Sequence, residues 1–161
     1  QKKFSKEIHY FNNVVKQTIK IIKAFRILDV PIRITEQNPQ GLGKTVKEIS
    51  EIIKENYIEK TSFDSLSNQN MGIQNNISNI IICGFESHVC IYQTVLSSVR
   101  KGYNTFFLTD AISSRKEIDH KTAVKSMQLY GAKPATVEMI IFQMLSNSEH
   151  EKFREISGLI K

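Results

Sequence analysis

The sequence predicts an α/β fold with three layers, in which helices cover both faces of a mainly parallel, Rossmann-like sheet. Short apolar runs alternate with longer stretches in which apolar residues recur every three or four positions. Two of these longer stretches end at a glycine, Gly102 or Gly131, as helices commonly do. Strands that alternate with helices form βαβ units, whose crossover connections make neighbouring strands parallel. The 161 residues show no linker or repeat, so we expect one domain over residues 1–161.

The first half of the chain predicts one long helix, two short strands and two irregular segments. Apolar residues recur at helical spacing from position 8 to 25, and the sequence predicts no strand ahead of them. Residues 30–35 are typical of a strand, with Pro31 near its start. After a polar loop at 36–44, Thr45 is placed to cap a short helix, and Glu48 would complete a capping box. Residues 57–60 form a second strand candidate, and residues 64–76 an irregular surface segment.

The second half predicts a more regular alternation of strands and helices. Residues 78–84 and 103–109 are apolar enough for buried strands, and residues 89–101 and 119–130 have helical spacing. A brief strand end at 135–136 leads into a helix at 137–145, and a terminal amphipathic helix spans about 149–160. These elements place both faces of the predicted sheet under helices.

Composition and charge exclude several classes of protein. The net charge of +6 comes from lysines spread along the chain, which favours a solvated surface over a nucleic-acid patch. No apolar run approaches the ~20 residues that span a bilayer, so we expect no membrane partner. The two cysteines form no disulfide framework, which predicts a reducing, cytoplasmic location. Organellar targeting stays open, because the chain does not begin with Met.

Cys90 is the prime candidate for a nucleophile. An apolar run ends at Gly84, and Cys90 follows six residues later, where a helical pattern opens. Backbone N–H groups gather at such a position, and open α/β sheets bind ligands beyond the carboxyl ends of their strands. The alternative is that Cys90 is a small buried apolar residue, which is how we interpret Cys83 inside the strand.

Four blocks of residues give the chain a resemblance to a known family. The blocks occupy residues 35–45, 59–63, 83–90 and 109–132, in that order. Together they resemble the isochorismatase-like cysteine hydrolase superfamily, close to its eukaryotic isochorismatase-domain-containing branch. The resemblance covers most of the chain.

The resemblance implies a catalytic triad of Cys, Lys and Asp. It assigns the nucleophile to Cys90 and the cation to Lys60, and it places the Asp on a first strand, two residues before Gln1. The thiol would attack a carbonyl carbon of a small amide-like or ester-like substrate, and water would release the covalent intermediate. The resemblance thus implies that this chain lacks its first strand and is N-terminally incomplete. We expect such a chain to be poorly stable and inactive by itself.

The resemblance also predicts how the nucleophile turn works. A cis peptide would join Phe85 and Glu86, and the N–H groups of Cys90 and its neighbour Val89 would form an oxyanion hole. Making a thiol mostly ionised near neutral pH needs ~2.7 kcal/mol, whereas a helix N-terminus typically provides ~0.3–1 kcal/mol. We therefore expect Lys60 to lower the thiol pKa further. Additional pocket or supporting residues would be Phe4, Asn38, Phe63, Ser87 and Asp110.

The same comparison of motifs bears on cofactors and partners. Metal-using nicotinamidases of the family carry an Asp and two His after the second strand, whereas residues 36–39 here are Glu-Gln-Asn-Pro. We therefore predict no zinc site and no cofactor.

We expect a small-molecule substrate and a homo-oligomer, with helices 119–130 and 137–160 as its surface. The alternative function is a non-catalytic or RNA-associated protein, since some family members carry a ribonuclease label. His88 lies two positions before Cys90 at the start of the predicted helix, so we expect it to point elsewhere. Its expected role is a cap or pocket wall and not a catalytic partner of Cys90.

Overall fold

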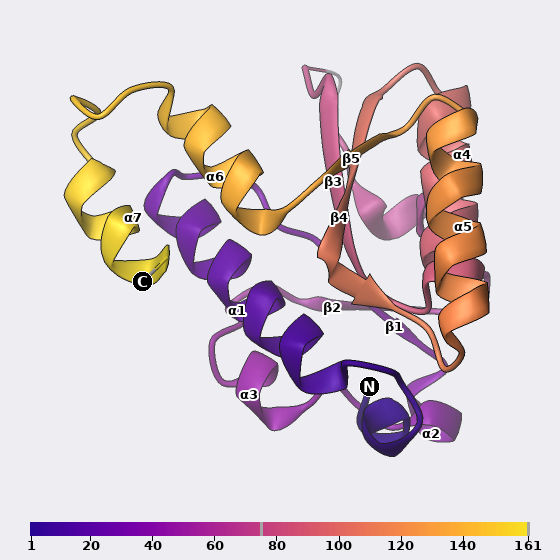
Figure 1. The fold of residues 1–161 in the computed structure, drawn as a ribbon. Coiled ribbons are helices and arrows are strands. Elements are labelled where there is room, and N and C mark those ends of the chain that lie inside the picture. The colour runs from indigo at the N-terminus through magenta and orange to yellow at the C-terminus, as the bar shows by residue number, and fades with distance from the viewer. Residues whose placement is uncertain (75, 161) are drawn as a thin grey trace.

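The computed structural model describes residues 1–74 and 76–160 and has three layers (Figure 1). Parallel strands form the middle layer, with helices on both faces, which confirms the predicted α/β class. The strands are β1 (Ile34–Gln37), β2 (Tyr57–Lys60), β3 (Asn79–Phe85), β4 (Asn104–Ser113) and β5 (Lys133–Ala135). The helices of two turns or more are α1 (Phe11–Ile27), α4 (Tyr92–Arg100), α5 (Glu117–Leu129), α6 (Val137–Leu145) and α7 (Phe153–Ile160). Single turns are α2 (Pro39–Leu42), α3 (Lys47–Ser50), a π-helical turn (Ser87–Ile91) and three 3₁₀ turns (Lys2–Lys6, Ser65–Ser67, Gln69–Met71).

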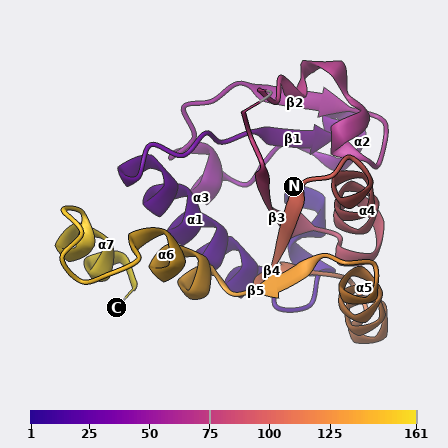
Figure 2. The same cartoon turned by 90° about the horizontal axis from the view of Figure 1, so that it is seen from above.

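The middle layer consists of two separate sheets and not of one continuous sheet. β1 pairs with β2, and β3, β4 and β5 form a second sheet in that order. Every pair is parallel. Figure 2 shows the two sheets side by side, with α1 and α6 on one flank and α4 and α5 on the other. Within the described residues, β1 and β3 therefore each keep one unpaired edge.

Strand β4 supplies side chains to both halves of the core. Successive residues of a strand point to opposite faces, and Phe107 and Leu108 are both fully buried. Leu108 packs with residues of α1, α6 and α7, whereas Phe107 packs with residues of α4 and α5. The continuous apolar run of β4 is thus explained by burial on two faces.

Two predictions about the first half of the chain are wrong. The strand predicted at 30–35 begins only at Ile34, because Pro31 lacks an N–H and the partner strand β2 aligns with residues 34–37. Thr45 does not cap a helix, since α3 begins at Lys47 and its N-terminus has no side-chain cap. Instead the backbone N–H and the hydroxyl of Thr45 both donate to buried Glu36, each at 2.6 Å.

Other element boundaries shift in the second half. The strand predicted at 103–109 continues to Ser113, and the helix predicted at 89–101 divides into the π-helical turn and α4. The helix predicted at 119–130 is α5, which begins two residues earlier, at Glu117, and the last helix begins only at Phe153. Residue 75 of the predicted irregular segment lies outside the described residues. None of the helices in the described part of the chain has the length and apolar content needed to cross a membrane.

Candidate active site

The carboxyl ends of β1 and β2 and the turn after β3 bring three polar side chains together. Gln37 ends β1, Lys60 ends β2, and the parallel register places these two residues side by side. Lys60 Nζ donates to Gln37 Oε1 at 2.8 Å, and the Cys90 thiol lies 3.9 Å from the same oxygen. Gln37 therefore links the predicted cation to the predicted nucleophile. The sequence prediction missed it, because only the strand register reveals its place.

Lys60 is a buried ammonium group held by neutral acceptors. Lys60 is 6% exposed. Besides Gln37, its Nζ donates to the backbone carbonyls of Ser62 at 2.9 Å and Phe63 at 3.0 Å. No carboxylate forms a salt bridge with Lys60 within residues 1–74 and 76–160. Burial lowers the pKa of Lys60, and the nearby Cys90 opposes that effect. The site thus holds a positive charge that no direct salt bridge of the described residues neutralises, and the Asp64 carboxylate raises its pKa from farther away.

Cys90 lies in the π-helical turn that follows β3. The chain enters this turn through a cis peptide between Phe85 and Glu86, as predicted. Burial raises the pKa of the Cys90 thiol, Lys60 lowers it, and Glu86 raises it further. Burial has the largest effect, so the pKa lies above its ordinary value, contrary to the expected depression. The Val89 N–H donates to the Glu86 carbonyl at 3.1 Å, so it is already engaged and not free for an oxyanion.

The Glu86 carboxylate fixes the turn to the loop that follows β4. It is 6% exposed and accepts hydrogen bonds from the backbone N–H of Arg115 at 3.2 Å and from its Nε at 2.9 Å. Two donors from one residue hold this carboxylate in a single orientation. Glu86 therefore positions the segment that bears Cys90 and does not reach Lys60.

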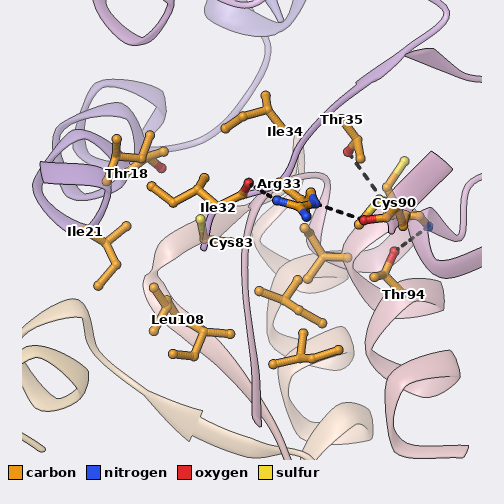
Figure 3. A pocket seen from close by; sticks show the side chains of 18 of the residues that line it. Thr18, Ile21, Ile32, Arg33, Ile34, Thr35, Cys83, Cys90, Thr94 and Leu108 are labelled. Atoms are coloured by element: carbon orange, nitrogen blue, oxygen red, sulfur yellow. Dashed lines mark hydrogen bonds between the residues drawn. The ribbon is translucent and has the colours of Figure 1, made fainter. Parts of the chain in front are cut away.

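A largely apolar cavity of about 400 Å³ adjoins Cys90 and Lys60. It follows the whole of β3 and reaches residues 30–35 and 37 on the other side. Figure 3 shows aliphatic side chains along most of its wall, with Cys83 among them and Cys90 in a different part of the wall. Because Cys90 follows the carboxyl end of β3, the thiol lies at that end of the cavity. A small substrate could therefore approach the thiol along an apolar path.

Of the three predicted pocket residues Phe4, Asn38 and Phe63, only Phe4 lines the cavity. Phe63 is 48% exposed, and it contributes its backbone carbonyl to Lys60 and not its ring to the cavity wall. Asn38 also stays out of the wall and uses its backbone N–H to bind the Lys60 carbonyl at 3.0 Å. Of the two roles expected for these residues, pocket wall or supporting residue, their backbone contacts with Lys60 agree with the second.

Ser87 and Asp110 support the fold away from the cavity. The Ser87 hydroxyl is fully buried and pairs with His120 Nδ1 at 2.9 Å. Asp110 Oδ1 accepts the backbone N–H of Val137 at 3.0 Å and so caps α6. The expected support of Cys90 by Asp110 is wrong, because β4 extends past Asp110 and directs it to the start of α6. His88 pairs with Ser114 at 2.9 Å, which agrees with a role other than catalysis.

In the part of the chain that the structure describes, no group of three or more His, Cys, Asp or Glu residues is arranged to hold a metal ion. The donor set around Cys90 consists of one thiol, one ammonium and one amide. An ammonium group repels a cation, so this part of the site does not favour a metal.

Comparison with known proteins identifies the family. The model of the Isochorismatase domain matches residues 1–139. The chain belongs to the isochorismatase family. Isochorismatase domain-containing protein 2 of Homo sapiens is 35% identical over 164 residues, which cover 100% of this chain and 79% of that protein. Isochorismatase family protein 1A of Dictyostelium discoideum is 38% identical over 167 residues, which cover 99% of this chain and 81% of that protein.

Solved structures agree with this membership. The structure of MAR1 ribonuclease from Caenorhabditis elegans has a TM-score of 0.91 and 36% identity, covering 99% of this chain and 84% of that one. The YcaC gene product of Escherichia coli, described as an octameric hydrolase of unknown specificity, has a TM-score of 0.88 and 18% identity. That match covers 99% of this chain and 82% of that one, and it shows a shared fold. The isochorismatase-like fold predicted from the four blocks is thus confirmed.

Proposed function

We propose that the chain is a cysteine hydrolase that uses Cys90 to attack the carbonyl carbon of a small amide-like or ester-like substrate. The observation behind this proposal is that Lys60 and Cys90 converge on Gln37 Oε1 at the end of a cavity. A lone buried cysteine is usually an apolar core residue. A thiol beside a buried ammonium group is better suited to nucleophilic chemistry, because the ammonium group favours the thiolate.

The reaction would proceed in two steps, formation of a thioester and its hydrolysis. The Cys90 sulfur forms a bond to the carbonyl carbon, and the amine or alcohol leaves with a proton. Water then cleaves the resulting thioester, which releases a carboxylic acid and restores the thiol. The Cys90 N–H and the Lys60 ammonium group would stabilise the negative charge that develops on sulfur and oxygen.

The proposal needs a base for the thiol proton. Burial raises the pKa of Cys90, and the acceptors of Lys60 are neutral, so Gln37, Ser62 and Phe63 provide no base. The family resemblance assigns the role of this base to an Asp. The Gln1 side chain donates to the Gln37 carbonyl at 2.8 Å, at the end of β1. A carboxylate close to Gln1 in the chain would therefore lie within reach of the same strand ends.

A panel of small amides and esters tests this function. Hydrolysis should be measured for the wild-type protein and for its Cys90→Ser and Cys83→Ser variants. We expect the Cys90 variant to lose at least ~100-fold in turnover and the Cys83 variant to retain turnover. The reason is that Cys90 contacts Gln37 Oε1, the oxygen that Lys60 also binds. Turnover that survives the Cys90 substitution would overturn the proposal.

A second candidate is ribonuclease activity, because the relative from Caenorhabditis elegans is named a ribonuclease. RNA cleavage should be measured with a fluorescent oligonucleotide over a range of salt concentrations. Cleavage that persists at physiological salt and in the Cys90→Ser variant would favour this candidate. Absence of cleavage in the wild-type chain, with amide or ester turnover present, would favour the cysteine hydrolase.

We also propose self-association through the outer faces of α5 and α6. Large apolar side chains there are solvent-exposed, at 80% for Leu129, 57% for Met139 and 41% for Phe142. Exposed large apolar side chains commonly mark an interface, and since α5 and α6 lie on opposite flanks of the middle layer, each helix would make a separate contact. Light scattering after size exclusion should give a mass above that of one chain, and Phe142→Lys should reduce it. A monomeric mass at ~100 μM, a concentration at which even weak dimers with micromolar constants form, would contradict this proposal.

A further inference from the structure

Three consecutive side chains of the turn that bears Cys90 bond to one short segment of the chain. The turn spans residues 86–91, and its partners all lie within residues 114–120, which we call the anchor segment. The anchor segment runs from the residue after β4 into the start of α5. The pairs, each joined at 2.9 Å between side chains, are Glu86 with Arg115, Ser87 with His120, and His88 with Ser114. The position of the turn is therefore tied to the start of α5.

The bond between Ser87 and His120 holds the residue that opens the π-helical turn. The Ser87 hydroxyl is fully buried, and within the described residues its hydrogen-bond partner is His120 Nδ1. Cys90 follows three residues later in the same turn. At the other end of the turn, Ile91 belongs to the same buried apolar cluster as Met127 of α5. Loss of the Ser87 bond would thus release one end of the turn while the other stays packed.

His120 is suited to hold Ser87 over the pH range in which a thiol titrates. Burial lowers its pKa, and nearby charges modify that effect. An ordinary imidazole has a pKa of ~6.5, so a lowered value leaves the ring neutral above about pH 7.5. A neutral imidazole can accept the Ser87 hydroxyl proton at Nδ1, whereas the protonated ring only donates there. His120 shares a polar cavity with the titratable side chains of His9, Tyr10, Asp110, Glu117 and Lys121.

We propose that His120 is a positioning residue for Cys90 and acts through Ser87. The bond holds the turn so that the thiol lies 3.9 Å from Gln37 Oε1, the oxygen that also binds Lys60 Nζ at 2.8 Å. His120 is absent from the wall of the apolar cavity beside the thiol, so it influences Cys90 through the turn and not by contact with a substrate. The inference rests on the proposed function of Cys90.

The expected effect follows from the distance between the thiol and the ammonium group. If the sulfur moves from ~6 to ~8 Å from the charge, at an effective dielectric constant of ~20, about threefold less thiolate forms at a given pH below the thiol pKa. The midpoint of Cys90 alkylation should therefore rise by ~0.5 pH unit. A histidine that only stabilises the fold would change Tm and leave this midpoint in place.

Alkylation of Cys90 by iodoacetamide, measured between about pH 7.5 and pH 11, tests the proposal. His120→Leu and Ser87→Ala each remove the bond between the turn and α5. His120→Asn is the conservative variant, because Asn Oδ1 and Nδ2 lie as many bonds from Cβ as His Nδ1 does. His9→Leu changes the same residue type in the same polar cavity and is the matched control.

We expect the midpoint to rise by ~0.5 pH unit in His120→Leu and in Ser87→Ala, and no further in the double variant, since both changes remove one bond. His120→Asn and His9→Leu should keep the wild-type midpoint. An unchanged midpoint in His120→Leu or Ser87→Ala would overturn the proposal, as would a rise in His120→Asn equal to that in His120→Leu.

Labelling of Cys83, which lies in β3, reports global unfolding in the same samples. If His120→Leu does not fold, Ser87→Ala and His120→Asn decide the outcome by the same criteria. Alkylation of Cys90 requires no turnover. A protein that hydrolyses no ester or amide would therefore refute the proposed function and leave the measured effect of His120 on the thiol intact.

Discussion

The charge on Lys60 should control how fast Cys90 reacts. Both Lys60 Nζ, at 2.8 Å, and Cys90 Sγ, at 3.9 Å, contact Gln37 Oε1, so the ammonium group and the sulfur are close neighbours. At a separation of ~6 Å and an effective dielectric constant of ~20, an ion pair is stabilised by ~2–3 kcal/mol. Replacing Lys60 with Met keeps an unbranched side chain and removes the charge. That energy corresponds to a ~30–160-fold smaller fraction of thiolate at a given pH below the thiol pKa.

The rate of alkylation by iodoacetamide measures this fraction at each cysteine. Rates should be followed by mass spectrometry of the peptides that contain Cys90 and Cys83, between about pH 6 and pH 11, where ordinary thiols near pKa ~8.5 titrate. Burial raises the Cys90 pKa, so wild-type labelling should be slow at neutral pH and should rise at alkaline pH. Burial raises the pKa of Cys83 to about 11, so Cys83 should label later than Cys90.

We expect Lys60→Met to slow Cys90 labelling ~30–160-fold at pH 8, because loss of the cation raises the thiol pKa further. Lys60→Arg keeps the charge and should retain most of the rate. The matched control is Lys121→Met on the exposed surface of α5, which should leave the rate unchanged. A Lys60→Met variant that labels as fast as the wild type, or faster, would refute the electrostatic argument.

Three further predictions concern stability, measured as the free energy of unfolding in urea. Glu86→Ala should cost ~1–3 kcal/mol, because a buried carboxylate loses two partly buried hydrogen bonds, whereas Glu117→Ala in an exposed pair should cost less. Asp110→Ala should cost ~0.5–2 kcal/mol through loss of the α6 cap and should leave Cys90 labelling unchanged; altered labelling would contradict its capping role. Burial lowers the His120 pKa, so its contribution to stability is present above the unfolded-state pKa of ~6.5 and is lost as pH falls through the lowered folded-state pKa. His120→Gln should lose this part of the pH dependence, and an unchanged profile between pH 7.5 and 5.5 would count against it.

Local patterns predicted the parts of the fold that are governed by burial. The apolar run of β3 and the helical spacing of α1 each reflect contacts with a core, so they are visible in the sequence alone. The nucleophile turn was predictable because its motif is contiguous, from Gly84 to Cys90. The family followed from four blocks of residues between 35 and 132, and the cis peptide from the resemblance that those blocks carry.

Features that depend on partners distant in the sequence could not be predicted in this way. Gln37 joins the site only because β1 pairs with β2 in a register that places it beside Lys60. Thr45 binds Glu36 across a loop and does not cap a helix, since a buried carboxylate competes for its N–H. Asp110 looked like a strand-end residue, but its partner is the start of α6, 27 residues later.

The raised thiol pKa is a consequence of the same long-range geometry. The sequence suggested a helix terminus and a lysine, both of which favour the thiolate. It did not reveal how deeply the packing of β3 and α4 would bury Cys90, and burial outweighs the charge of Lys60. The balance between desolvation and charge is set by packing, which residue identities alone do not determine.

If Cys90 is the nucleophile, a covalent intermediate should form on its sulfur. The wild-type chain should be mixed with 4-nitrophenyl acetate, quenched in acid at short times, and examined by intact mass and peptide mapping. We expect one acetyl group on Cys90 in the wild type and in Cys83→Ser, and none in Cys90→Ser. In Lys60→Met the rate of acetylation should fall at least ~10-fold. Acetylation distributed equally over Cys83 and Cys90 would contradict the role of Cys90 as the nucleophile.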